Sequence, residues 1–152
     1  MAPNETRTPG PDAPGQVVRG RPRFIDVRST KSPDGSREIE VTLEWPGGRR
    51  SSGEGESVGL PEAEDRAAAQ ATLAAIGSGP LPDPALRLRG TKAIRAFDHL
   101  VIVVAVDRDV DGGTTPLIGS VCAPKSDRVR GAVLATLNAV NRVIEGEVPP
   151  NR

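Results

Sequence analysis

The chain has 152 residues, and its 20 basic and 20 acidic side chains give a formal net charge of zero. It contains two phenylalanines, one tryptophan and no tyrosine. Nucleic-acid binding usually needs a basic excess for the phosphates and aromatic side chains for stacking, so this composition argues against it. One cysteine and one histidine exclude an intramolecular disulfide and cannot by themselves hold zinc.

Two absences in the sequence concern the membrane. No apolar run approaches the ~20 residues that span a bilayer, and no signal-peptide core follows Met1. We therefore expect a cytoplasmic protein that does not associate with membranes.

Proline and glycine divide the chain into segments. Residues 1–22 contain five prolines and few side chains that could be buried, so this segment is predicted to be disordered, as is the tail 147–152. The strongest internal break is the Pro-rich linker 78–84. It separates two units of similar length within one domain of residues 23–146: a first unit over 23–77 and a second over 85–146.

The first unit is expected to contain three strands and a helix. The strands cover residues 24–30, 37–45 and 49–57, and the second alternates apolar and polar side chains as a half-buried strand does. Pro61 suits the first position of a helix that runs to Ile76. The acidic residues at the start of this helix complement its positive end: Glu62, Glu64 and Asp65.

The second unit repeats this order. Strands are predicted over 86–96, 99–107 and 115–122, with an acidic loop over 109–113. Ser126 is the expected N-cap of the second helix. The helix carries an apolar stripe at steps of three and four residues, which must be buried: Val129, Val133, Leu137, Val140 and Ile144.

The two units also resemble each other in sequence. Residues 67–76 (AAAQATLAAI) and 131–140 (GAVLATLNAV) are identical at five of ten positions at an offset of 64. Residues 55–57 before the first helix are aligned with 119–121 before the second. We interpret this as an internal duplication. The predicted fold class is α+β, with two tandem βββα units whose helices pack on one face of a common antiparallel sheet.

Strand 100–106 is apolar on both of its faces. Two helices can cover only one side of the sheet, so the other side needs a partner. We therefore expect a homodimer.

No catalytic set is recognisable. His99 lies at a turn next to Asp98, and Cys122, at the end of an apolar strand, is expected to be a small buried core residue. Asp107, Asp109 and Asp111 resemble the first half of a calcium loop, but Ile118 stands where the bidentate acid belongs. We expect no catalytic residue, metal site or cofactor.

Several short motifs resemble the C-terminal leucine-sensing regulatory domain of 2-isopropylmalate synthases. They are residues 41–48 (VTLEWPGG), 53–57 (GEGES), 117–120 (LIGS), Asp127 and the helical residues 137–141 (LNAVN). The resemblance covers most of residues 23–146 and lacks the catalytic barrel of that family. It implies a dimeric domain that binds its effector between the units, and it places the following residues nearest the ligand: Gly53, Gly55, Ser57, Gly119, Ser120, Lys125, Ser126 and Asp127. Lys125 and the free N–H groups there would accept a carboxylate.

The order of strands, Gly-rich turn and Ala-rich helix also resembles a double-stranded-RNA-binding domain. The residues that would bind phosphate are acidic in the first unit (61–65) and mildly basic in the second (124–128).

We therefore predict a non-catalytic regulatory or scaffolding module, dimeric and with a small-molecule effector. A double-stranded-RNA-binding module is the alternative hypothesis, and an enzyme of unrecognised type is the third.

Overall fold

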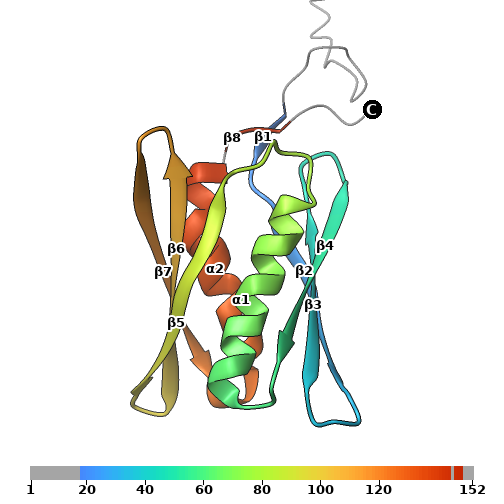
Figure 1. Cartoon of the computed structure of the whole chain (residues 1–152), viewed down its shortest axis with the longest axis vertical. Coiled ribbons are helices and arrows are strands. Elements are labelled where there is room, and N and C mark those ends of the chain that lie inside the picture. Colours follow the sequence, from blue (N-terminus) through green and yellow to red (C-terminus); the bar gives the residue numbers. More distant parts are fainter. Residues whose placement is uncertain (1–17, 145, 149–152) are drawn as a thin grey trace, which may run out of the picture.

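The computed structural model describes residues 18–144 and 146–148. It consists of short terminal strands and two βββα units (Figure 1). The elements in chain order are β1 (Val18–Gly20), β2 (Arg23–Lys31), β3 (Arg37–Glu44), β4 (Arg50–Ser57), α1 (Pro61–Gly77), β5 (Leu86–Ala96), β6 (His99–Val110), β7 (Gly113–Pro124), the 3-10 helix η1 (Lys125–Asp127), α2 (Arg128–Ile144) and β8 (Gly146–Val148).

The predicted α+β class with two βββα units is confirmed. All strand pairs are antiparallel, and the six long strands form two three-stranded sheets of order β2-β3-β4 and β5-β6-β7. This differs in one respect from the expected common sheet. Both helices lie between the two sheets, each on the inner face of its own (Figure 1). The apolar faces of both sheets and both helices therefore enclose one core.

The central strand of each sheet supplies the inner apolar face. On β3, the alternating residues Ile39, Val41 and Leu43 are buried, and their neighbours point outward. On β6, the same alternation buries one set of side chains: Leu100, Ile102, Val104 and Val106. The period of two in each strand thus turns every second residue toward the helices.

The helices bury different kinds of side chain. α1 is packed on several sides through alanines, so its backbone comes close to β4, β5 and α2. α2 buries Val133, Leu137, Val140 and Ile144 of the predicted stripe, whereas Val129 in its first turn is only half-buried. Because alanine is small, α1 gains close approach rather than a large buried apolar area.

Two hydrogen bonds show that the units are equivalent. Thr72 in α1 and Thr136 in α2 are both fully buried, and each hydroxyl donates to the carbonyl four residues earlier at 2.7 Å. The two threonines are 64 residues apart, which is the offset found in the sequence. The helices therefore align as the sequence indicated.

The strands before the two helices, β4 and β7, do not align at the offset of 64 that relates the helices. A Cβ on Gly53 would meet Ala71 and Ala75, and a Cβ on Gly119 would meet their counterparts Ala135 and Ala139. Gly119 is thus the equivalent of Gly53 rather than of Gly55. The predicted alignment of residues 55–57 with 119–121 was wrong by two residues because short Gly/Ser motifs carry little register information.

Strands β6 and β7 are longer than predicted. They pair as far as Val110 with Gly113, so most of the expected acidic loop is strand and the turn is short. Gly112 has a φ of 80°, which fits a tight turn. The aspartates of this region are engaged along the strands: Asp107 lies near Arg87 and Arg89, and Asp109 accepts a hydrogen bond from Thr114.

Two local predictions in the second unit are wrong. Ser126 is not an N-cap, because it lies within η1, whose own cap position is Pro124, and α2 begins only at Arg128. Cys122 is exposed rather than a core residue. Its partner in the register, Val101, lies on the outer side of β6, so the alternation of β7 turns Cys122 outward too.

The terminal segments fall partly outside the described residues. Residues 1–17 and 149–152, predicted to be disordered, are among those not described. Val18–Gly20, from the first predicted segment, and Gly146–Val148, which begins at the last residue of the predicted domain and continues into the predicted tail, form the short antiparallel pair β1–β8. This pair joins the two ends of the domain at one end of the molecule (Figure 1).

Candidate functional site

Three of the residues expected near a ligand are glycines in contact with a helix backbone. A Cβ on Gly53 or Gly119 would lie 2.2 Å from a backbone atom of α1 or α2, and one on Gly55 would lie 2.1 Å from the Ala67 carbonyl oxygen. Close packing of strand on helix therefore accounts for glycine at all three positions. A ligand is not needed to explain them.

The two serines of the predicted site have different environments. Ser57 is buried at the end of β4, where its hydroxyl accepts a hydrogen bond from the backbone N–H of Gly59 at 3.0 Å. Ser120 is exposed on β7, and its carbonyl accepts a hydrogen bond from Asn138 of α2 at 3.0 Å. A hollow of about 380 Å³ lies beside Gly119, Ser120 and Asn138.

The last three predicted residues lie together on the surface. Lys125, Ser126 and Asp127 form η1 and line a second hollow of about 360 Å³ with the edge of β2 and the start of α2. The structure thus divides the predicted ligand residues between β4, β7 and η1 rather than bringing them into one hollow. Their role in binding stays a prediction.

The described residues offer no preformed metal site. Among residues 18–144 and 146–148, no group of three or more His, Cys, Asp and Glu side chains could hold a metal ion. His99 is exposed at the start of β6, as expected for a turn residue.

The outer faces of the two sheets are chemically different. On the first sheet, every row across β2, β3 and β4 carries a charged side chain. Glu44, for example, lies between Arg23 and Arg50, with N–O distances of 2.7 and 3.4 Å. Side chains that carry charge are readily hydrated, so this face is suited to solvent.

The outer face of the second sheet has an apolar centre. The register places Ile94, Val101 and Cys122 in one row, and Ala105 beside Ile118 two rows further on. Ile94 is 46 % exposed and Ile118 68 %. We call this surface the β6–β7 face. It consists of the following outward residues: Ile94, Val101, Val103, Ala105, Ile118, Ser120 and Cys122.

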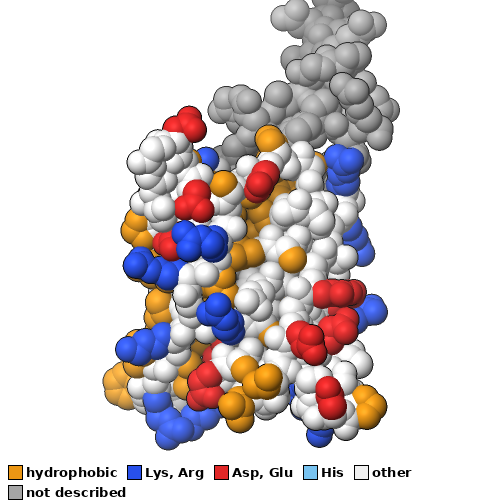
Figure 2. Space-filling model, in the orientation of Figure 1, with side chains coloured by type: hydrophobic (Ala, Val, Ile, Leu, Met, Phe, Trp, Pro, Cys, Tyr) orange, Lys and Arg blue, Asp and Glu red, His pale blue; other side chains and the backbone are white. Residues whose placement is uncertain are grey.

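The charges around the β6–β7 face are confined to one side. Arg87, Arg89 and Lys92 lie along β5, and Asp107 and Asp109 lie near them, which leaves a net charge of +1 from three cations and two anions. The outward residues of β7 between 114 and 124 carry no charge. Figure 2 shows basic side chains gathered on the β5–β7 side and acidic ones on the lower β3–β4 side.

Sequence reasoning identified the apolar strand but not this surface as a whole. The sequence predicted that both faces of strand 100–106 are apolar, and the structure shows that Val101, Val103 and Ala105 are the outward set. Ile94, Ile118 and Cys122 join them only through the pairing register, which a single strand does not reveal. The signal available in the sequence was the period-two alternation of the neighbouring strands β5 and β7, which indicates which of their residues share a face.

Comparison with known proteins gave no match to a family model and none to a curated protein. In the part of the chain that the structure describes, no helix has the length and apolar character needed to cross a bilayer.

Proposed function

We propose that this protein is a non-catalytic regulatory or scaffolding module that works as a homodimer through the β6–β7 face. The observation that carries the proposal is the contrast between the two sheets. Their inner faces are alike, yet one outer face carries a charge in every row and the other has an apolar centre. Contiguous exposed apolar surface rimmed by polar groups is typical of an interaction site.

A second copy of the chain is the partner that this face fits. An apolar centre with a charged edge has the anatomy of an interface core and rim. A two-fold axis over β6 and β7 would place the β5 side chains Arg87, Arg89 and Lys92 of each copy over the uncharged outer side of β7 or at the rim. Like charges would then not oppose each other, and each cation would remain hydrated.

The tandem βββα architecture is also what the resemblance to the regulatory domain of 2-isopropylmalate synthases implies. That resemblance supports a regulatory role, in which the module responds to binding or assembly and does not catalyse a reaction.

The proposal is tested by light scattering coupled to size-exclusion chromatography. We expect a mass of twice 15.9 kDa at high micromolar concentration. Ile118→Lys should shift the equilibrium to the monomer, because a charge at the apolar centre cannot be hydrated in the interface. Ser52→Lys is the matched control, since Ser52 is exposed on β4, the corresponding edge strand of the charged sheet.

Cys122 supplies an independent readout because it is the only cysteine and lies within the β6–β7 face. Its reaction with a thiol reagent should slow as protein concentration rises, and this protection should be lost in Ile118→Lys. A monomer at high micromolar concentration would overturn the proposal. A dimer unaffected by Ile118→Lys would overturn the assignment of the face.

A further inference from the structure

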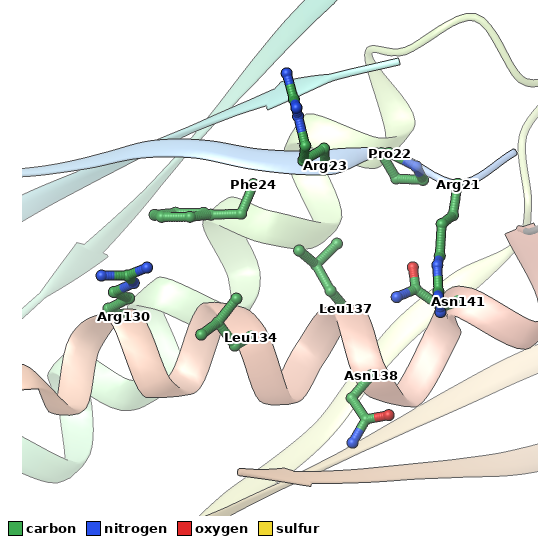
Figure 3. A pocket seen from close by; sticks show the side chains of 9 residues that line it. All are labelled: Arg21, Pro22, Arg23, Phe24, Arg130, Leu134, Leu137, Asn138 and Asn141. Carbon is green, nitrogen blue, oxygen red and sulfur yellow. The ribbon is translucent and has the colours of Figure 1, made fainter. Parts of the chain in front are cut away.

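A groove of about 540 Å³ runs between β2 and α2, away from the β6–β7 face (Figure 3). Its apolar floor is formed by Phe24 from β2 and by Leu134 and Leu137 from α2, whose side chains point toward one another. Leu137 is buried, whereas Phe24 and Leu134 are half-buried. An apolar body lying here would cover surface that is now partly open to water.

The polar groups of the groove are all cationic or neutral. The described residues that line it include three arginines and no acid. Arg23 points away and pairs with Glu44 at 2.7 Å, while Arg21 reaches toward Asn141 at one end (Figure 3). At the other end the Arg130 guanidinium lies 5.6 Å from the centre of the Phe24 ring.

Asn141 adds unused hydrogen-bonding capacity beside Arg21. Its Oδ1 is buried and has no hydrogen-bond partner among the described residues. Buried polar atoms are nearly always paired in native proteins, so an unpaired amide oxygen at the end of a groove indicates a missing partner. As placed, this oxygen can only accept a hydrogen bond; turning the amide over would present its N–H₂ group, which can donate to an anion.

We propose that the β2–α2 groove binds a small organic anion with an aliphatic body, with its carboxylate at Arg21 and Asn141 and its chain over Leu137 and Leu134. Charge-assisted hydrogen bonds from a guanidinium suit a carboxylate. An α-amino acid is disfavoured, because its ammonium group would face arginines with no acid to pair with among the described residues that line the groove. From Leu134 to Asn141 the helix rises about 10 Å, the length of an extended chain of roughly eight carbons.

The groove beside α2 has no equivalent beside α1 among the described residues. At the offset of 64, Arg130, Leu134 and Asn141 correspond to Arg66, Gln70 and Gly77 of α1. The duplication therefore does not provide a second copy of this constellation. This inference deepens the proposed regulatory role by naming the chemical class of the effector, but its site is separate from the dimer face.

Octanoate is the probe, with octylammonium and octanol as matched compounds of opposite and no charge. In a titration followed by backbone amide NMR up to about 10 mM, well above a Kd of ~1 mM, octanoate should shift residues 21–24 and 130–141. Octylammonium should not shift them. Arg21→Gln should weaken octanoate binding about tenfold, while Arg23→Gln, whose side chain points away, should leave it nearly unchanged.

The same titration on Ile118→Lys separates this inference from the proposed dimer. Octanoate shifts that persist in a monomeric variant support the groove and leave dimerisation to its own test. Norleucine should bind more weakly than 2-oxohexanoate. No saturable shift, shifts centred elsewhere, equal binding of all three octyl compounds, or equal effects of Arg21→Gln and Arg23→Gln would overturn the proposal.

Discussion

Asp65 of α1 and Arg128 of α2 form a bidentate ion pair that joins the two units. The Arg128 Nε and Nη2 atoms donate to the two carboxylate oxygens of Asp65 at 3.0 and 2.6 Å. The Asp65 side chain is 2 % exposed and that of Arg128 21 %. The hydrogen bond from Arg128 to Asp65 raises the pKa of the guanidinium, so it remains charged at any working pH.

Asp65→Ala should destabilise the fold by about 3 kcal/mol, because it leaves a partly buried cation without its partner. The free energy of unfolding from urea denaturation measures the effect. The double variant Asp65→Leu with Arg128→Met should recover most of the loss, since apolar side chains of similar volume fill the same space.

Glu64→Ala is the control for this prediction. Glu64 pairs with Arg37 at 3.1 Å, but the Arg37 side chain is 39 % exposed and both residues belong to the first unit. This more hydrated pair should contribute about 1 kcal/mol or less. Equal losses of unfolding free energy in Asp65→Ala and Glu64→Ala would show that the ion pair between the units stabilises the fold no more than the hydrated pair does.

Gly119→Ala should destabilise the second unit by at least about 3 kcal/mol. The added Cβ would lie 2.2 Å from the Ala135 carbonyl oxygen and 2.4 Å from the Ala139 nitrogen, and backbone cannot move aside cheaply. Gly113→Ala in the same strand has open space around it and should change the unfolding free energy little. A tolerated Gly119→Ala would contradict the close packing of β7 on α2.

Ser51→Ala should cost about 2 kcal/mol, because it leaves the buried Trp45 Nε1–H unpaired and leaves the Ala75 carbonyl with only the longer hydrogen bond from the Ser78 hydroxyl, at 3.2 Å. The Ser51 hydroxyl accepts from Trp45 Nε1 at 2.8 Å and donates to the Ala75 carbonyl at 2.6 Å. Trp45 is the only tryptophan, so its fluorescence reports on this site directly. We expect a changed emission maximum in the folded variant, and an unchanged spectrum would contradict the hydrogen bond.

The β2–β3 turn should weaken in acid. Hydrogen bonds from the Ser36 hydroxyl and backbone N–H hold the pKa of Asp34 below its usual value. Because the pKa of Asp34 is lower in the folded chain than in the unfolded chain, the ionised carboxylate stabilises the folded state at pH values above the unfolded pKa of ~3.9. This stabilisation is lost as the pH falls through the pKa of the folded state. NMR titration of the Asp34 carboxyl carbon should give a midpoint below that of Ser36→Ala; equal midpoints would contradict it.

The local elements of this fold could be read from the sequence. Period-two alternation in 37–45, Pro61 with its following acids and the stripe from Val129 to Ile144 predicted strands and helices within a few residues of their observed bounds. These signals are local because side-chain direction follows from the backbone period alone. The repeat at offset 64 predicted two like units for the same reason.

What the sequence by itself determined was therefore the order and type of the elements and the duplication that relates them. The tertiary structure decided how six strands divide into two sheets, that Gly119 is the counterpart of Gly53, and that Cys122 lies outside the core. It also brought together Asp65 with Arg128 and Phe24 with Arg130. These relationships depend on pairing register and on the packing of distant segments, which hydrophobic periodicity within one segment does not encode.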